Sequence, residues 1–171
     1  GLNLPVWQQY WNWISGMLSG NPGNSLVSGE PIGPIIAFRA GNTFTLMLCA
    51  AVIGLPIAFI MGVLAAVKPK GVMDGFVNVI SVVIASLPEF VIGILLIILF
   101  STGLFHWLPA VSMISPGAGP FSDPVLLILP VGTLVIALLP YTSRQMRASM
   151  LEVLDSEYVL MAEVKGLPRR I

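Results

Sequence analysis

Glu89 is the one charged residue within the three long apolar stretches of this chain. A bare carboxylate at the centre of a bilayer costs on the order of 3 kcal/mol or more, so such a side chain should not face lipid. If residues 76–100 form one helix, the i, i+4 spacing puts Glu89 on a face of mostly small residues that points into a bundle: Ser81, Ala85 and Gly93. Two roles stay open, because Glu89 could line a substrate path or brace a kink at Pro88 as a protonated or hydrogen-bonded carboxyl.

Other chemistry-bearing residues do not form a catalytic set. The chain has one histidine, His106, and one cysteine, Cys49, with no metal-ligand cluster and no Ser, His and Asp grouping within reach. It also lacks the glycine-rich loop followed by Lys and Ser or Thr that holds nucleotide phosphates. We therefore expect no enzymatic activity, no metal and no cofactor; if ATP is used, another chain must bind it.

The composition indicates an integral membrane protein. Hydrophobic residues make up 56% of the 171 residues and charged residues only 9%, whereas soluble domains carry roughly a quarter charged residues. Eight Lys and Arg balance eight Asp and Glu, so net charge gives no indication of nucleic-acid binding.

Three stretches are long and apolar enough to cross a bilayer, namely residues 43–67, 76–100 and 125–143. They must be helical, because lone strands would leave unpaired backbone groups in lipid. Lys and Arg, which favour the cytoplasmic side, are concentrated in residues 68–75 and 144–171. The prediction is an all-α protein with those two segments cytoplasmic and residues 1–42 and 101–124 extracytoplasmic.

Two helix faces indicate neighbours. In the first segment, an aromatic stripe at helical spacing predicts an amphipathic helix at the outer membrane surface, resting on lipid or docking a partner: Trp7, Tyr10, Trp11, Ile14, Met17 and Leu18. In the first span, small residues at i, i+4 intervals form a ridge that lets another helix approach closely: Ala50, Gly54, Ala58, Gly62 and Ala66.

The last segment predicts a second, short helix beyond the membrane. Asp155 or Ser156 is suited to the N-cap, Gly166 to the left-handed stop, and the helix runs over 157–165. Two turns are not stable alone in water. This helix could dock a partner, rest at the membrane surface or simply connect two elements.

The strings RASMLEVLDSE (147–157) and YVLMAEVKGLPRRI (158–171) closely resemble the cytoplasmic loop of the inner-membrane permeases of binding-protein-dependent ABC importers, best the dipeptide, oligopeptide and nickel branch. Ala162 and Gly166 match the second Ala and the Gly of that loop's E-A-A-x-x-x-G pattern, while Leu160 and Met161 replace its Glu and first Ala. Three other strings are also similar to segments of these permeases and support the resemblance: GNTFTLML (41–48), SLPEF (86–90) and HWLPA (106–110).

The resemblance implies that the chain is part of a six-helix type I permease in the cell inner membrane, carrying peptides or similar solutes. It implies separate ABC ATPase subunits, a second homologous permease subunit and an extracytoplasmic solute-binding protein as partners. The helix 157–165 would be the coupling helix that contacts the ATPase, through Glu157, Tyr158, Met161, Ala162, Lys165 and Gly166.

Two other functions remain open. A membrane scaffold that transports nothing would use the tail helix only as a protein contact. An ion-coupled carrier is less well supported, because it calls for several ionisable groups in mid-membrane and only Glu89 qualifies.

Overall fold

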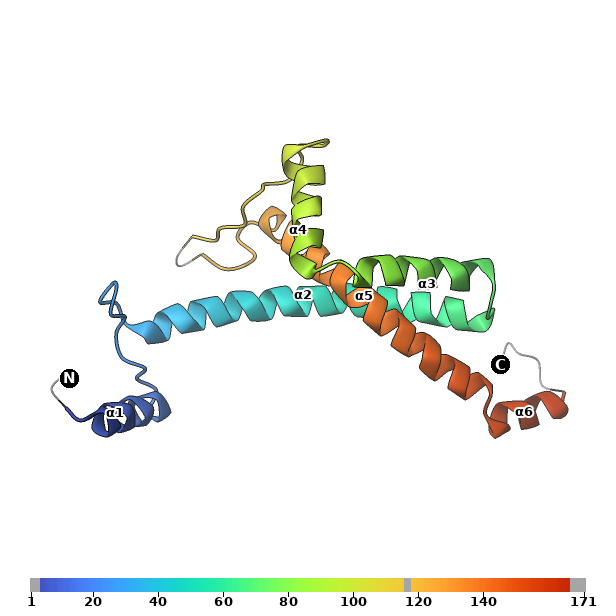
Figure 1. Ribbon diagram of the computed structural model, residues 1–171, viewed down its shortest axis with the longest axis horizontal. Coiled ribbons are helices and arrows are strands. Elements are labelled where there is room, and N and C mark those ends of the chain that lie inside the picture. Colours follow the sequence, from blue (N-terminus) through green and yellow to red (C-terminus); the bar gives the residue numbers. More distant parts are fainter. Residues whose placement is uncertain (1–3, 116–117, 167–171) are drawn as a thin grey trace. The chain divides into compact units, whose positions relative to one another are not determined.

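The computed structural model describes residues 4–115 and 118–166, and these residues form helices joined by loops, with one isolated bridge between Asn24 and Pro31. The chain divides into two units, residues 1–45 and 46–171, and α2 runs through the boundary. In chain order the elements (Figure 1) are α1 (Val6–Leu18), α2 (Ile32–Val67), α3 (Val72–Ala85), α4 (Glu89–Ile97), the π-helical turn η1 (Ile98–Thr102), α5 (Val125–Leu154) and α6 (Glu157–Val164).

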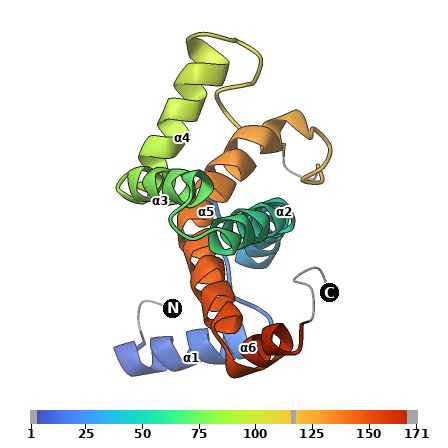
Figure 2. The ribbon, with the colours of Figure 1, turned by 90° about the vertical axis from the view of Figure 1, so that its right-hand side faces the viewer.

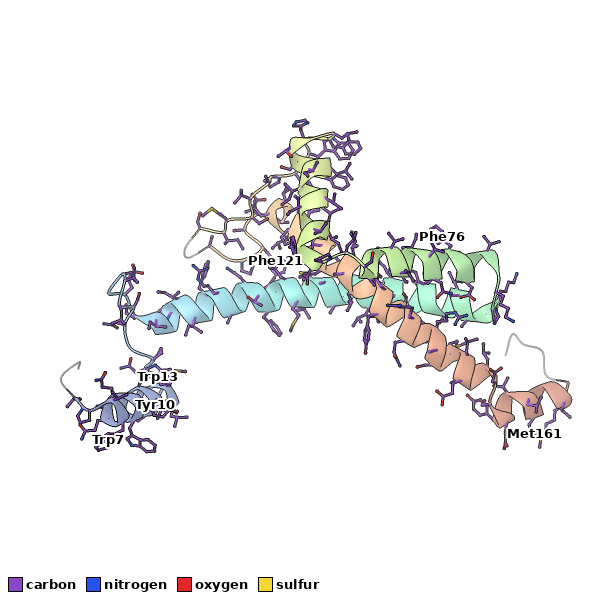
Figure 3. All side chains as sticks on the ribbon, in the orientation of Figure 1. Trp7, Tyr10, Trp13, Phe76, Phe121 and Met161 are labelled. Carbon is purple, nitrogen blue, oxygen red and sulfur yellow. The ribbon has the colours of Figure 1, made fainter. Side chains whose placement is uncertain are left out.

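The aromatic helix predicted near the N-terminus is confirmed as α1. It begins after Pro5, whose carbonyl accepts the amides of Gln8 and Gln9, and none of its residues is buried. Figure 3 marks Trp7, Tyr10 and Trp13 on this helix. Its aromatic side chains stay more than half exposed: Trp7, Tyr10, Trp11 and Trp13. Among residues 4–45, the described part of its own unit, nothing buries the aromatic side chains of α1.

Helix α2 begins at Ile32, well before the apolar stretch predicted to start at residue 43. Pro34 lies in its first turn, where a missing N–H breaks no helical hydrogen bond. Two threonines that follow are satisfied within the helix, since the Thr43 hydroxyl donates to the Arg39 carbonyl at 3.0 Å and the Thr45 hydroxyl donates to the Gly41 carbonyl at 2.9 Å. The predicted apolar stretch is therefore the second part of a longer helix. The helix ends at Val67, where the stretch was predicted to end.

In the second unit, the end of α2, α3 and α5 meet along small side chains. Figures 1 and 2 show α3 beside the last turns of α2, after the short turn 68–71, with α5 crossing both. All five ridge residues of α2 are buried. The closest approach is at Gly62, where an added Cβ would lie 2.6 Å from the Cβ of Met146. Further toward the start of α5, Ala50 packs in a cluster with Leu127, Val131 and Val135.

Large apolar side chains of α2 lie outside the contact between its small residues and α5. On α2, Val52, Phe59 and Ile60 are each more than half exposed. Water is a poor solvent for such a surface, whereas lipid is not. The described residues contain two helices, α2 and α5, that are long and apolar enough to cross a membrane, and a third crossing if α3 and α4 together form one span.

The single helix predicted for residues 76–100 is wrong, because the structure breaks it at Ser86–Pro88 and bends it by 97°. Pro88 has no N–H and disfavours helical geometry at Leu87. The chain accordingly ends α3 with Ser86 N–H donating to the Val82 carbonyl, and restarts with Val91 and Ile92 donating to the Pro88 carbonyl. After the break, α4 packs on α5, where an added Cβ on Gly93 would be 3.5 Å from Thr133.

Candidate functional site

Helix α6 (Glu157–Val164) is the short tail helix expected over 157–165. The Ser156 carbonyl accepts the amides of Val159 and Leu160, so Ser156 stands at the start of the helix. Its hydroxyl, however, donates backwards to the Val153 carbonyl rather than capping α6, and Asp155 closes the end of α5. The expected N-cap contact is thus replaced by a bond that ties the two helices together.

Gly166 ends α6 in the left-handed conformation that glycine favours, with φ +75°. The Lys165 amide still donates to the Met161 carbonyl at 3.1 Å. The last residues of the string compared above, 167–171, lie outside the described part of the chain. Within it, α6 has a defined start and stop.

One face of α6 forms a shallow, open hollow. It is lined by five residues spaced alternately one and three apart: Glu157, Tyr158, Met161, Ala162 and Lys165. These are five of the six residues expected to contact an ATPase, and Gly166 follows directly. Tyr158 and Met161 expose 65% and 60% of their surface, and Figure 3 marks Met161 on α6. A two-turn helix with so much uncovered apolar surface is suited to contact another protein.

An ion pair that the sequence reasoning missed lies between α3 and α5. Arg147 Nε is 2.6 Å from Asp74 Oδ1 and Arg147 Nη2 is 2.7 Å from Asp74 Oδ2, a two-point contact of guanidinium with carboxylate. Asp74 also accepts the Lys70 amide and the Asn78 side-chain amide, both at 2.8 Å. Only 4% of Asp74 is exposed. Four donors thus surround a carboxylate that has about four acceptor positions.

Glu89 lies at the break, as the first residue of α4, and is exposed. The face it was expected to share with Ser81 and Ala85 does not exist, because those two residues belong to α3 and the backbone turns between them and Glu89. Ser81 is buried between helices while Glu89 is not. The structure therefore separates Glu89 from Ser81 and Ala85 and keeps it four residues before Gly93 on α4, and its role stays a prediction.

These features define a class: an all-α integral membrane protein whose helices meet through small residues and whose last long helix leads into a short, exposed helix. A family model described as "Binding-protein-dependent transport system inner membrane component" matches residues 54–170, well over half of the chain. The chain belongs to this family of inner-membrane proteins. The match includes α3, α4, α5 and α6.

Curated relatives agree with this assignment. The chain is 35% identical to the dipeptide transport system permease protein of Lactococcus lactis subsp. cremoris over 99% of its own length and 54% of the relative's. It is 34% identical to the oligopeptide transport system permease protein of Bacillus subtilis over 97% of its length and 53% of the relative's. The chain thus spans about half the length of the curated relatives it matches.

Proposed function

We propose that the chain forms part of a permease subunit of an ABC importer, which provides part of the transmembrane path for peptides or similar solutes. The exposed hollow on α6 carries this proposal: it lies inside the family match and brings together the residues expected to contact an ATPase. ATP would be hydrolysed by separate ATPase subunits, since the sequence has no nucleotide-binding loop. Peptides are proposed because the relatives are named as dipeptide and oligopeptide permeases.

The remaining partners follow from the same assignment. The family description includes dependence on a binding protein, so we propose that an extracytoplasmic solute-binding protein delivers the substrate. A second, homologous permease subunit would complete the path. Exposed apolar side chains on α2 and α3 would face membrane lipid or this second subunit. Glu89, at the break before α4, is the candidate residue for lining the path.

Crosslinking tests the ATPase contact. In a chain whose native Cys49 is replaced by Ala, a cysteine at Met161 should crosslink to an ATPase subunit in the assembled importer. A cysteine at Phe121, equally exposed but in the loop predicted to lie on the other side of the membrane, is the control. It should give no such crosslink and should react with an impermeant maleimide added outside. A crosslink from Phe121, or none from Met161, would contradict the proposal.

Substitution of Ala162 tests whether the contact drives transport. Ala162 lines the hollow, so Ala162→Asp places a charge in the contact and should abolish ATP-driven peptide uptake. Ala162→Ser is the control of similar size and should transport normally. Both chains should insert into the membrane in equal amounts on an immunoblot. Normal uptake by Ala162→Asp with the Met161 crosslink intact would show that the contact does not drive transport.

A further inference from the structure

Asp74 joins three elements of the second unit rather than two. It lies in the first turn of α3 and pairs with Arg147 on α5. It also accepts the amide of Lys70, a residue held at φ +63° in the turn between α2 and α3. That backbone conformation is uncommon for a residue with a side chain, so the bond to Asp74 helps to hold the turn. The α2–α3 hairpin and α5 are therefore connected through one carboxylate.

Arg147 lies midway between Pro140 and the end of α5 at Leu154. Pro140, seven residues before it, removes a backbone hydrogen bond and is the last helix-breaking residue of α5. Residues 141–154, here called the α5 stem, contain no Pro or Gly and lead to α6. Arg147 lies about 10 Å from Pro140 and about 10 Å from Leu154, at 1.5 Å per residue. Arg147 thus adds a polar attachment between the stem and the hairpin, next to Met146, which packs against Gly62 of α2.

We propose that the Asp74–Arg147 pair is a positioning contact that makes the α5 stem and the α2–α3 hairpin move as one body. A displacement of α6 then moves α2 and α3, instead of bending α5 at Pro140. Neither residue touches the substrate. This inference rests on the proposed function, because it assumes that an ATPase displaces α6.

The burial of Asp74 indicates that its ion pair with Arg147 is difficult to break while the chain stays folded. Asp74 is nearly inaccessible, whereas the Arg147 side chain keeps 24% of its surface exposed. Removing one partner of a buried pair leaves the other charge uncompensated, while removing both relieves that penalty. Asp74→Asn and Arg147→Met should therefore each impair coupling, and the double variant should be no worse than either single variant.

The test uses the complete importer in proteoliposomes, with peptide uptake and ATP hydrolysis measured on the same samples. Asp74→Asn should assemble with the ATPase and lower uptake per ATP by about tenfold, a usual size for coupling between sites. Arg147→Lys, which keeps the charge but loses the two-point contact, should fall between Asp74→Asn and the unmodified chain. Glu152→Gln is the matched control: an exposed acid on the same stem, nearer to α6, with the same loss of charge. It should keep the normal ratio.

A normal ratio of uptake to ATP hydrolysis in Asp74→Asn would overturn the proposal. If Asp74→Asn fails to accumulate, the Arg147→Lys variant decides between coupling and folding. A normal ratio of uptake to ATP hydrolysis in Arg147→Lys, or equal failure of this variant to accumulate, would show that the pair is needed only for folding.

Spin labels at Val72 and Tyr158, both well exposed, give a readout that needs no transport. The distribution of distances between the two labels should broaden in Asp74→Asn, and an unchanged distribution would also overturn the proposal. Failure of the unmodified importer to couple uptake to ATP would instead refute the proposed function.

Discussion

Replacing Gly62 with alanine should force α2 and α5 apart. An added Cβ would lie 2.6 Å from Met146 Cβ and 2.8 Å from the Ser143 carbonyl oxygen, which belongs to the backbone and cannot rotate away. Non-bonded carbon atoms pack at about 3.5–4.0 Å, so α5 would have to move by about 1 Å. Overpacking of this kind costs about 1–3 kcal/mol. The clash involves backbone, so we expect the upper half of that range.

Gly75→Ala is the control that isolates this penalty. Gly75 also lies in a helix, but an added Cβ there meets nothing within 4 Å. Both substitutions gain about the same helix propensity, roughly 1 kcal/mol. The difference between their unfolding free energies therefore measures the overpacking alone. Gly54→Ala should fall between them, since its added Cβ would be tight only against the tip of the flexible Leu138 side chain, at 3.1 Å, and would touch Val135 at an ordinary contact distance of 3.6 Å.

Reversible unfolding of the purified chains in mixed micelles, followed as the fraction of SDS rises, gives the three free energies. We expect Gly62→Ala to be less stable than Gly75→Ala by about 2–3 kcal/mol, within the range for overpacked cores. Equal stability of the two variants would show that the helices do not approach closely at Gly62, and would refute the reasoning.

Two further predictions concern exposed residues. Glu89→Gln should lower peptide uptake in the importer while leaving membrane insertion unchanged, because the carboxyl lies exposed at the helix break; unchanged uptake for every peptide tested would leave only the bracing role. A chain that keeps Trp11 as its sole tryptophan should be quenched more by lipids brominated near the headgroup than by lipids brominated at the chain end, because α1 exposes its aromatic face. The opposite order of quenching would exclude a surface position for α1.

Hydropathy and small-residue spacing predicted the apolar parts of α2 and α5 and the ridge on α2, because these patterns are set by local sequence. The 97° break could not be obtained in the same way. A proline indicates a missing hydrogen bond and a kink, but the angle depends on what each half packs against, and α3 and α4 both pack on α5.

The ion pair escaped prediction for a different reason. Asp74 and Arg147 are 73 residues apart in the sequence. The sequence offered one weak indication, an acid and a base each close to an end of an apolar stretch on the same predicted side. Pairing them requires knowing that α3 lies against α5, which is tertiary information.

The break before α4 has a consequence for solvent. Among the described residues, no side chain caps the start of α4, so the first amides, those of Glu89 and Phe90, lack a capping partner. In hydrocarbon each unpaired backbone group costs several kcal/mol, and irregular backbone occurs at membrane depth only against protein or in a water-filled cavity. If the break lies within the bilayer, it must be wetted or covered by another subunit.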